Sequence, residues 1–232
     1  KLKSAFGTSL SNNKNVYFVP SFMPSKIATK NTTANASSGM GTSTYWLNEN
    51  TLNYDRNWDL HHLNLLGGFT MENRQNSTMG ISVTGLTDDI MKYNNFASAD
   101  QVNRTVSSNA EKNSRVSYLG RINYDFDSKY YLTMSGRYDG ASNFAMNNKW
   151  GFFPSFGVKW RVSNESFFKE SEVKKTISDM GFRFSYGKSG NQGIGNYQSL
   201  ATLAPNSKGY IFGENPVLGY TQSSMDNPNL TW

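Results

Sequence analysis

The residue types that most often carry catalysis or hold metal ions are few in this sequence and unfavourably spaced. The two histidines, His61 and His62, are adjacent, and neighbours on a strand point to opposite faces, so they cannot easily chelate one ion. Asp88 and Asp89 offer the hard oxygen ligands that calcium prefers, but no EF-hand loop surrounds them, which favours a solvated acidic pair. The absence of cysteine excludes thiolate chemistry, disulfides and Cys-ligated metals.

A glycine-rich run at Gly190, Gly193 and Gly195 suggests a phosphate-binding loop at first sight. The nucleotide motif is G-x-G-x-x-G followed by an apolar helix in a βαβ unit, whereas here the order is reversed and no such helix follows. A flexible loop is therefore the better interpretation. No Ser-His-Asp set or paired carboxylates can be argued from spacing, so we predict neither an enzyme nor a bound cofactor or metal.

The basic residues are placed more regularly. The net charge is +6, but the cations do not gather in a patch interleaved with stacking aromatics, so nucleic-acid binding is not expected. They lie instead on the polar faces of separate predicted strands, where they would make the inner wall of a barrel locally cationic. The candidate lumen-facing residues are Arg121, Arg137, Lys159, Arg161 and Arg183.

The strands that position these cations are predicted from residue types that alternate with a period of two. Apolar, often aromatic, side chains alternate with small, polar or cationic ones, as in a strand whose successive side chains point to opposite faces. The pattern is clear in the second half of the chain and weaker before it. The seven predicted strands cover residues 1–10, 44–54, 62–73, 116–124, 130–139, 152–162 and 180–187.

Aromatic residues stand near the ends of these strands on the apolar face. Tyr and Trp favour the boundary between membrane and water, because one part is apolar and the other hydrogen-bonds; a soluble β core is the alternative interpretation. The candidate lipid-interface aromatics are Tyr118, Tyr124, Tyr130, Tyr138, Phe152, Trp160 and Tyr186.

The predicted connections alternate in length, as in a barrel with short turns at one end and long loops at the other. In the stretch 163–178 we expect a short helix capped by Ser163 or Asn164, and in 88–96 a helical turn. The long loops are predicted at 11–42, 74–114, 140–150 and 188–231, and the short connections at 55–61, 125–129 and 163–178.

Composition fits a membrane barrel better than a soluble globule. Only 17% of residues are charged, against about a quarter in typical domains, while 14% are aromatic. No run approaches the roughly 18 apolar residues of a membrane-spanning helix. The sequence begins with Lys1 and not with an initiator Met. Its last residues, up to Trp232, are typical of the start of a strand. We therefore expect a piece of a longer polypeptide, whose other strands close the barrel.

Several motifs in order carry a family resemblance. They resemble the central barrel of the SusC/RagA family, TonB-dependent outer-membrane transporters of Bacteroidetes. The sequence departs from the family pattern at Ala141, commonly Ser, and at Asn143 and Lys149, both commonly Arg. The matching stretches are LGRINY at 119–124, YLT at 131–133, RYDGASNF at 137–144, WGFFPS at 150–155, SYGKSGNQGIGNY at 185–197 and NPNLTW at 227–232.

The resemblance implies an all-β, antiparallel transmembrane barrel of about 22 strands, with residues 1–232 as a partial barrel domain lacking the plug. It implies nutrient import, of oligosaccharides or oligopeptides, as the channel component of a SusC/SusD-like complex. The implied partners are a SusD-like surface lipoprotein, the TonB–ExbB–ExbD complex acting through the absent N-terminal region, outer-membrane lipid and a second copy of the parent protein.

Two alternatives stay open on the sequence. One is an outer-membrane barrel that serves as an adhesin or an assembly scaffold through its Asn/Ser/Thr-rich loops. The other is a soluble β-sandwich that binds carbohydrate, with loop aromatics such as Tyr197 and Tyr210 stacking on sugars.

Overall fold

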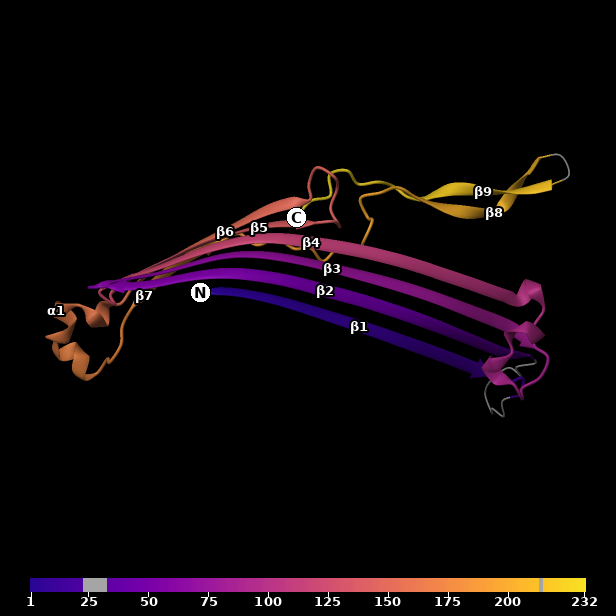
Figure 1. Ribbon diagram of the computed structural model, residues 1–232, viewed down its shortest axis with the longest axis horizontal. Helices are drawn as coiled ribbons and strands as arrows, with labels where there is room; N and C mark the ends of the chain where they lie inside the picture. The colour runs from indigo at the N-terminus through magenta and orange to yellow at the C-terminus, as the bar shows by residue number, and fades with distance from the viewer. Residues whose placement is uncertain (23–32, 213–214) are drawn as a thin grey trace. The chain divides into compact units, whose positions relative to one another are not determined.

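The computed structural model describes residues 1–22, 33–212 and 215–232, and nearly all of its regular structure is β-strand (Figure 1). Seven strands form one sheet in chain order, and two more form a separate hairpin. The all-β prediction is confirmed, since each predicted strand corresponds to one strand of the larger sheet. The strands of the sheet are β1 (Leu2–Val19), β2 (Ala34–Trp58), β3 (His61–Leu86), β4 (Arg104–Phe126), β5 (Tyr130–Ala141), β6 (Trp150–Trp160) and β7 (Phe182–Gly187).

The register of β4 to β7 confirms the two predicted faces. All three neighbouring pairs are antiparallel, and residues directly opposite each other share a face. Tyr138 on β5 stands opposite Tyr118 on β4 and Phe152 on β6, while Trp160 stands opposite Tyr130 and Phe182. The period of two in each strand thus adds up to one continuous apolar face and one polar face.

Two of the predicted long loops are wrong over most of their length. In 11–42, β1 continues to Val19 and β2 begins at Ala34; in 74–114, β3 continues to Leu86 and β4 begins at Arg104. Residues 23–32 lie outside the described part. These strands are rich in Ser, Thr and Asn, and the sheet ladder is made by backbone groups, which need no apolar alternation.

The prediction of a loop at 188–231 is also wrong in part, because β8 (Thr202–Phe212) and β9 (Asn215–Ser224) pair in it as an antiparallel hairpin. Residues 227–232, which resemble a strand start, contain no strand. The loop at 140–150 is confirmed apart from its end residues, as is the turn after Phe126. The turn predicted at 55–61 shrinks to Asp59 and Leu60.

Both stretches predicted to be helical contain short helices, but the predicted helix cap is wrong. The stretch 88–96 contains η1 (Lys92–Asn94) and the start of η2 (Phe96–Ser98), followed by η3 (Gln101–Asn103). The connection after β6 contains η4 (Val162–Asn164), α1 (Ser166–Lys169) and η5 (Glu172–Lys175).

The predicted cap of α1 is wrong: its N-cap is Glu165, which makes no side-chain cap bond. The two predicted caps have other partners, since the Ser163 hydroxyl donates to Asp179 and the Asn164 amide donates to the carbonyl of Ser128. These bonds reach other parts of the chain, which a local capping rule does not consider.

The contacts divide the chain into two compact units. The first comprises residues 1–7, 47–72 and 113–232, and the second comprises 8–46 and 73–112. The second unit has a small core of Ala34, Ala36, Val83, Leu86 and Ala99.

All candidate cations and aromatics belong to the first unit. Its buried apolar residues include Ala141, Phe144, Ala145, Val162 and Phe168. By contrast, the apolar face of the sheet is open: Tyr118 and Tyr138, which lie on the interior strands β4 and β5, are 49% and 44% exposed.

This exposure argues against the soluble sandwich, in which a second sheet would cover that face. The described residues form only one larger sheet and one hairpin. In the described part of the chain, no helix has the length and apolar character to span a bilayer.

Candidate functional site

A row of aromatic rings crosses the apolar face from β3 to β6, level with the first residue of β6. The rings of Tyr138 and Trp150 stack with centroids 4.8 Å apart, Tyr118 lies 6.2 Å from Trp150, and Phe69 lies 5.2 Å from Tyr118. Gly140 stands opposite Trp150, and a Cβ atom added there would come within 2.8 Å of the indole. The glycine therefore gives the indole room to lie flat on the strand.

Trp150 was not among the predicted aromatics, because the sequence assigned it to the loop at 140–150. It starts β6 instead. The signal that finds it is its position two residues before Phe152, in the same phase of the alternation.

A second aromatic row lies at the other end of the same face. Phe126 lies 6.4 Å from Tyr130 and 4.9 Å from the imidazole of His61, while Trp160 lies 6.3 Å from Phe182. His61 Nδ1 also forms a 2.6 Å hydrogen bond with the hydroxyl of Tyr124. This histidine belongs to the aromatic row.

The separation of the two rows suits a membrane. Trp150 and Trp160 are the first and last residues of the 11-residue β6, which places them about 34 Å apart along the strand. At the roughly 40° tilt of outer-membrane strands this becomes about 26 Å across the bilayer, close to the ~25 Å apolar band between the aromatic girdles of such barrels.

The polar face holds an aligned ion pair at Arg137. Its Nε donates to both carboxylate oxygens of Asp139, at 2.7 and 2.8 Å, and its Nη2 donates to Ser117 Oγ at 3.1 Å. Asp139 and Ser117 are buried, while the Arg137 side chain is 43% exposed. The buried carboxylate thus holds the Arg137 guanidinium in place, while part of the arginine side chain stays exposed on the polar face.

The other predicted cations are not gathered around Arg137. Lys159 Nζ lies 5.3 Å from the centre of the Tyr131 ring, and Arg183 stands directly opposite Lys159 on β7. Arg161 follows the last residue of β6, where it donates to Asp179 at 3.0 and 3.3 Å. Arg121 is exposed and pairs in register with Ser135.

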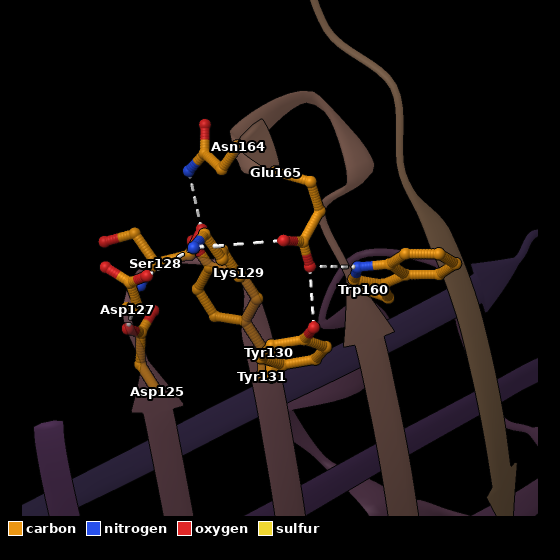
Figure 2. Close-up of polar contacts among 9 residues, drawn as sticks. All are labelled: Asp125, Asp127, Ser128, Lys129, Tyr130, Tyr131, Trp160, Asn164 and Glu165. Carbon is orange, nitrogen blue, oxygen red and sulfur yellow. Dashed lines mark hydrogen bonds and ion pairs between the residues drawn. The ribbon is translucent and has the colours of Figure 1, made fainter. Parts of the chain in front are cut away.

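A polar cluster lies at the end of the sheet where residues 127–129 connect β4 to β5, and its centre is Glu165 (Figure 2). Glu165 Oε1 accepts hydrogen bonds from the Tyr130 hydroxyl at 2.6 Å and from the Trp160 indole at 2.9 Å. Lys129 Nζ lies 3.8 Å from Glu165 Oε2 and 2.6 Å from Asp127. One carboxylate therefore ties the start of β5 and the end of β6 to the connection after β6.

The neighbouring bonds of this cluster converge on the carbonyl of Ser128. It accepts from the Asn164 amide at 2.6 Å and from the Tyr131 hydroxyl at 3.0 Å, while the Ser128 N–H donates to Asp125. Ser128 has a φ of 50°, a left-handed conformation that few non-glycine residues adopt. Hydrogen bonds to both the carbonyl and the N–H of Ser128 thus hold the turn between β4 and β5.

Two carboxyl groups outside the strands have lowered pKa values. The hydrogen bond from Tyr130 contributes most to lowering the pKa of Glu165, followed by the bond from Trp160. The pKa of Asp179 is lowered first by the Ser163 hydroxyl and then by the Arg161 guanidinium. Both carboxyl groups are therefore held in their ionised form by donors from other segments.

An aromatic cluster on the polar side was missed by the sequence analysis. Trp232 packs on Phe144 with centroids 4.7 Å apart and meets Phe153 edge-on at 5.3 Å, and its indole donates to the carbonyl of Lys149 at 2.9 Å. Phe144 is 1% exposed. These residues come from separate stretches, and their local patterns carry no signal that they meet.

The remaining candidates have ordinary structural partners. Asp89 accepts from the backbone and hydroxyl of Ser21, Asp88 accepts from the N–H of Ile90, and His62 contacts Asp55. Across residues 1–22, 33–212 and 215–232, no three His, Asp or Glu side chains gather as a set of metal ligands.

Comparison with known proteins gives a consistent result. The sequence profile of the family described as "TonB dependent receptor-like, beta-barrel" matches residues 3–232. TonB-dependent receptor P3 of Formosa agariphila is 33% identical over 240 residues, which cover 100% of this chain and 22% of that protein. TonB-dependent receptor SusC of Bacteroides thetaiotaomicron is 35% identical over 126 residues, covering 53% of this chain and 12% of SusC.

A solved structure agrees with these relatives. The structure of the RagAB peptide transporter matches with a TM-score of 0.84 at 25% identity, covering 100% of this chain and 24% of that chain. The chain spans less than a quarter of the length of these relatives and of the matched transporter chain.

Proposed function

The chain belongs to the TonB-dependent receptor-like β-barrel family, and from this premise we propose that its parent protein imports nutrients, oligosaccharides or oligopeptides, across the outer membrane. Receptors of SusC/RagA type are outer-membrane proteins of Bacteroidetes, and the chain is a segment of such a barrel. The family is one of transport receptors rather than of enzymes. The observation that carries the proposal is the sheet with one aromatic-rimmed apolar face and one polar, cationic face.

We assign the apolar face to lipid and the polar face to the lumen. The two aromatic rows support this, because their spacing fits the bilayer and their hydroxyl and indole groups suit its boundaries. The assignment places Tyr118, Tyr138 and Trp150 at one boundary and Tyr130 and Trp160 at the other. Arg137 would then belong to the lumen wall.

The partners follow from the same premise. The parent protein would act as the channel under a SusD-like surface lipoprotein and draw energy from the TonB–ExbB–ExbD complex. The identity to SusC and the likeness to the RagAB peptide transporter support this assembly. The cluster around Glu165 would close the periplasmic side of the wall, since short turns of outer-membrane barrels lie there.

An uptake experiment tests the transport function. A strain lacking the parent protein is compared with its complemented strain for accumulation of labelled oligosaccharides and labelled oligopeptides, each with and without a functional TonB. Loss of one class of solute in both the deletion strain and the TonB-deficient strain is expected. Unchanged uptake of both classes, with loss of surface attachment instead, would favour the adhesin or scaffold.

A further inference from the structure

A shallow groove of about 660 Å³ lies among β5, β6 and β7, and its basic residues stand side by side. Lys159 and Arg183 are direct partners in the register of β6 and β7. Side chains at such positions have Cβ atoms about 5 Å apart, and like charges there repel. Each of the two cations therefore raises the energy of the other unless an anion lies between them.

The nearby carboxylates have other partners. Asp125 accepts a hydrogen bond from the N–H of Ser128. Asp179 accepts hydrogen bonds from Ser163 and Arg161, and the positive charge of Lys159 also stabilises its ionised form. Within the part of the chain that the structure describes, no carboxylate forms an ion pair with Lys159 or Arg183. The positive charge of the groove is thus only partly balanced.

The rest of the lining suits a small anionic group. Ser185 carries an exposed hydroxyl, the exposed hydroxyl of Ser155 forms a 2.7 Å hydrogen bond with that of Ser135, and Tyr131 flanks Lys159. Gly157 and Gly187 add no side chains that would fill the groove. A lysine and an arginine at directly opposed strand positions, with hydroxyl groups nearby, can recognise a carboxylate, since Arg binds its two oxygens together and Lys adds a point charge.

We propose that the groove between Lys159 and Arg183 binds a carboxylate group. The carboxylate has two possible sources: a solute carried by the parent protein, or an acidic side chain of that protein outside residues 1–232. The first source rests on the proposed transport function, whereas the binding site itself does not.

The test uses the purified full-length parent protein in detergent. The variant Lys159→Gln/Arg183→Gln removes both charges, and Lys159→Arg/Arg183→Lys keeps them. The matched control, Lys169→Gln/Lys174→Gln, removes two charges from the connection after β6, outside the groove. The midpoint of heat unfolding is measured without additive, with citrate as a tricarboxylate probe, and with sodium chloride at the same ionic strength.

For a solute carboxylate, citrate raises the midpoint of the wild type and of the control, and the neutral variant loses at least half of that rise. For an internal carboxylate, citrate has no specific effect, the neutral variant unfolds at a lower temperature than the control, and the charge-keeping variant restores the midpoint.

The proposal is overturned if the neutral variant matches the control in both measurements, or if the charge-keeping variant does not restore what the neutral one loses. The test needs no uptake, so failure of the transport assay would leave its result standing.

Discussion

The hydroxyl of Tyr130 donates a 2.6 Å hydrogen bond to Glu165 and so joins the first residue of β5 to the N-cap of α1. The same carboxylate accepts from Trp160, the last residue of β6 (Figure 2). Tyr130 and Trp160 are direct partners across β5 and β6. The carboxylate of the N-cap residue of α1 thus closes the end of a strand pair instead of capping the helix.

Glu165→Ala should loosen the connection after β6. Without the carboxylate, the donors of Tyr130 and Trp160 lose their acceptor, and residues 162–178 lose two hydrogen bonds to the strands. We expect trypsin to cleave the folded full-length protein several-fold faster at Lys169, Lys174 or Lys175. The control is Glu172→Ala, which removes an exposed carboxylate whose partner is Lys175. Equal cleavage of the two variants would contradict the anchoring role.

The same connection should be sensitive to acid but not to mild base. The folded state lowers the pKa values of Glu165 and Asp179, so their ionised forms stabilise the fold above the unfolded pKa values, about 4. That stabilisation is lost as the pH falls through the lower, folded values. Hydrogen-exchange protection of residues 161–180, corrected for intrinsic rates, should stay constant from about pH 8 to 5 and fall below about pH 4. Loss of protection on going from pH 5 to 8 would contradict the assignment.

Gly140→Ala should disturb the aromatic row, because a methyl group there would come within 2.8 Å of the Trp150 ring. Displacing an indole in a close-fitted row is expected to cost about 1–3 kcal/mol. Gly120→Ala is the matched control, since no atom lies within 4 Å of its added Cβ. Urea unfolding of the purified full-length protein in detergent measures both. A loss of stability at Gly120 as large as that at Gly140 would exclude the ring contact as the cause.

Arg137→Gln should cost more stability than Arg121→Gln. Removing Arg137 leaves the buried carboxylate of Asp139 without its partner, at an expected cost of about 1–3 kcal/mol, whereas Arg121 is exposed. The double variant Arg137→Gln/Asp139→Asn should recover part of the loss, because no buried charge remains. Urea unfolding compares the four proteins. No recovery in the double variant would mean that the pair contributes through its shape rather than its charge.

The sequence by itself determined which side of β4, β5, β6 and β7 is apolar. Alternation from 116 to 187 predicted both faces, and the register of β4 to β7 confirms them, since a period of two leaves only two faces to choose between. It also predicted the seven strands in order. It failed on the lengths of β1 to β4, because polar strands are held by backbone hydrogen bonds and carry no apolar alternation.

The tertiary structure decided which side chains meet. Lys159 and Arg183 became direct partners through the register of β6 and β7, Glu165 reached Tyr130 through the turn after β6, and Trp232 came to lie on Phe144. Periodicity assigns a side chain to a face, but contact between distant residues depends on register and on the path of the connections. Those are set by the sum of many weak interactions over the whole sheet, which no local pattern contains.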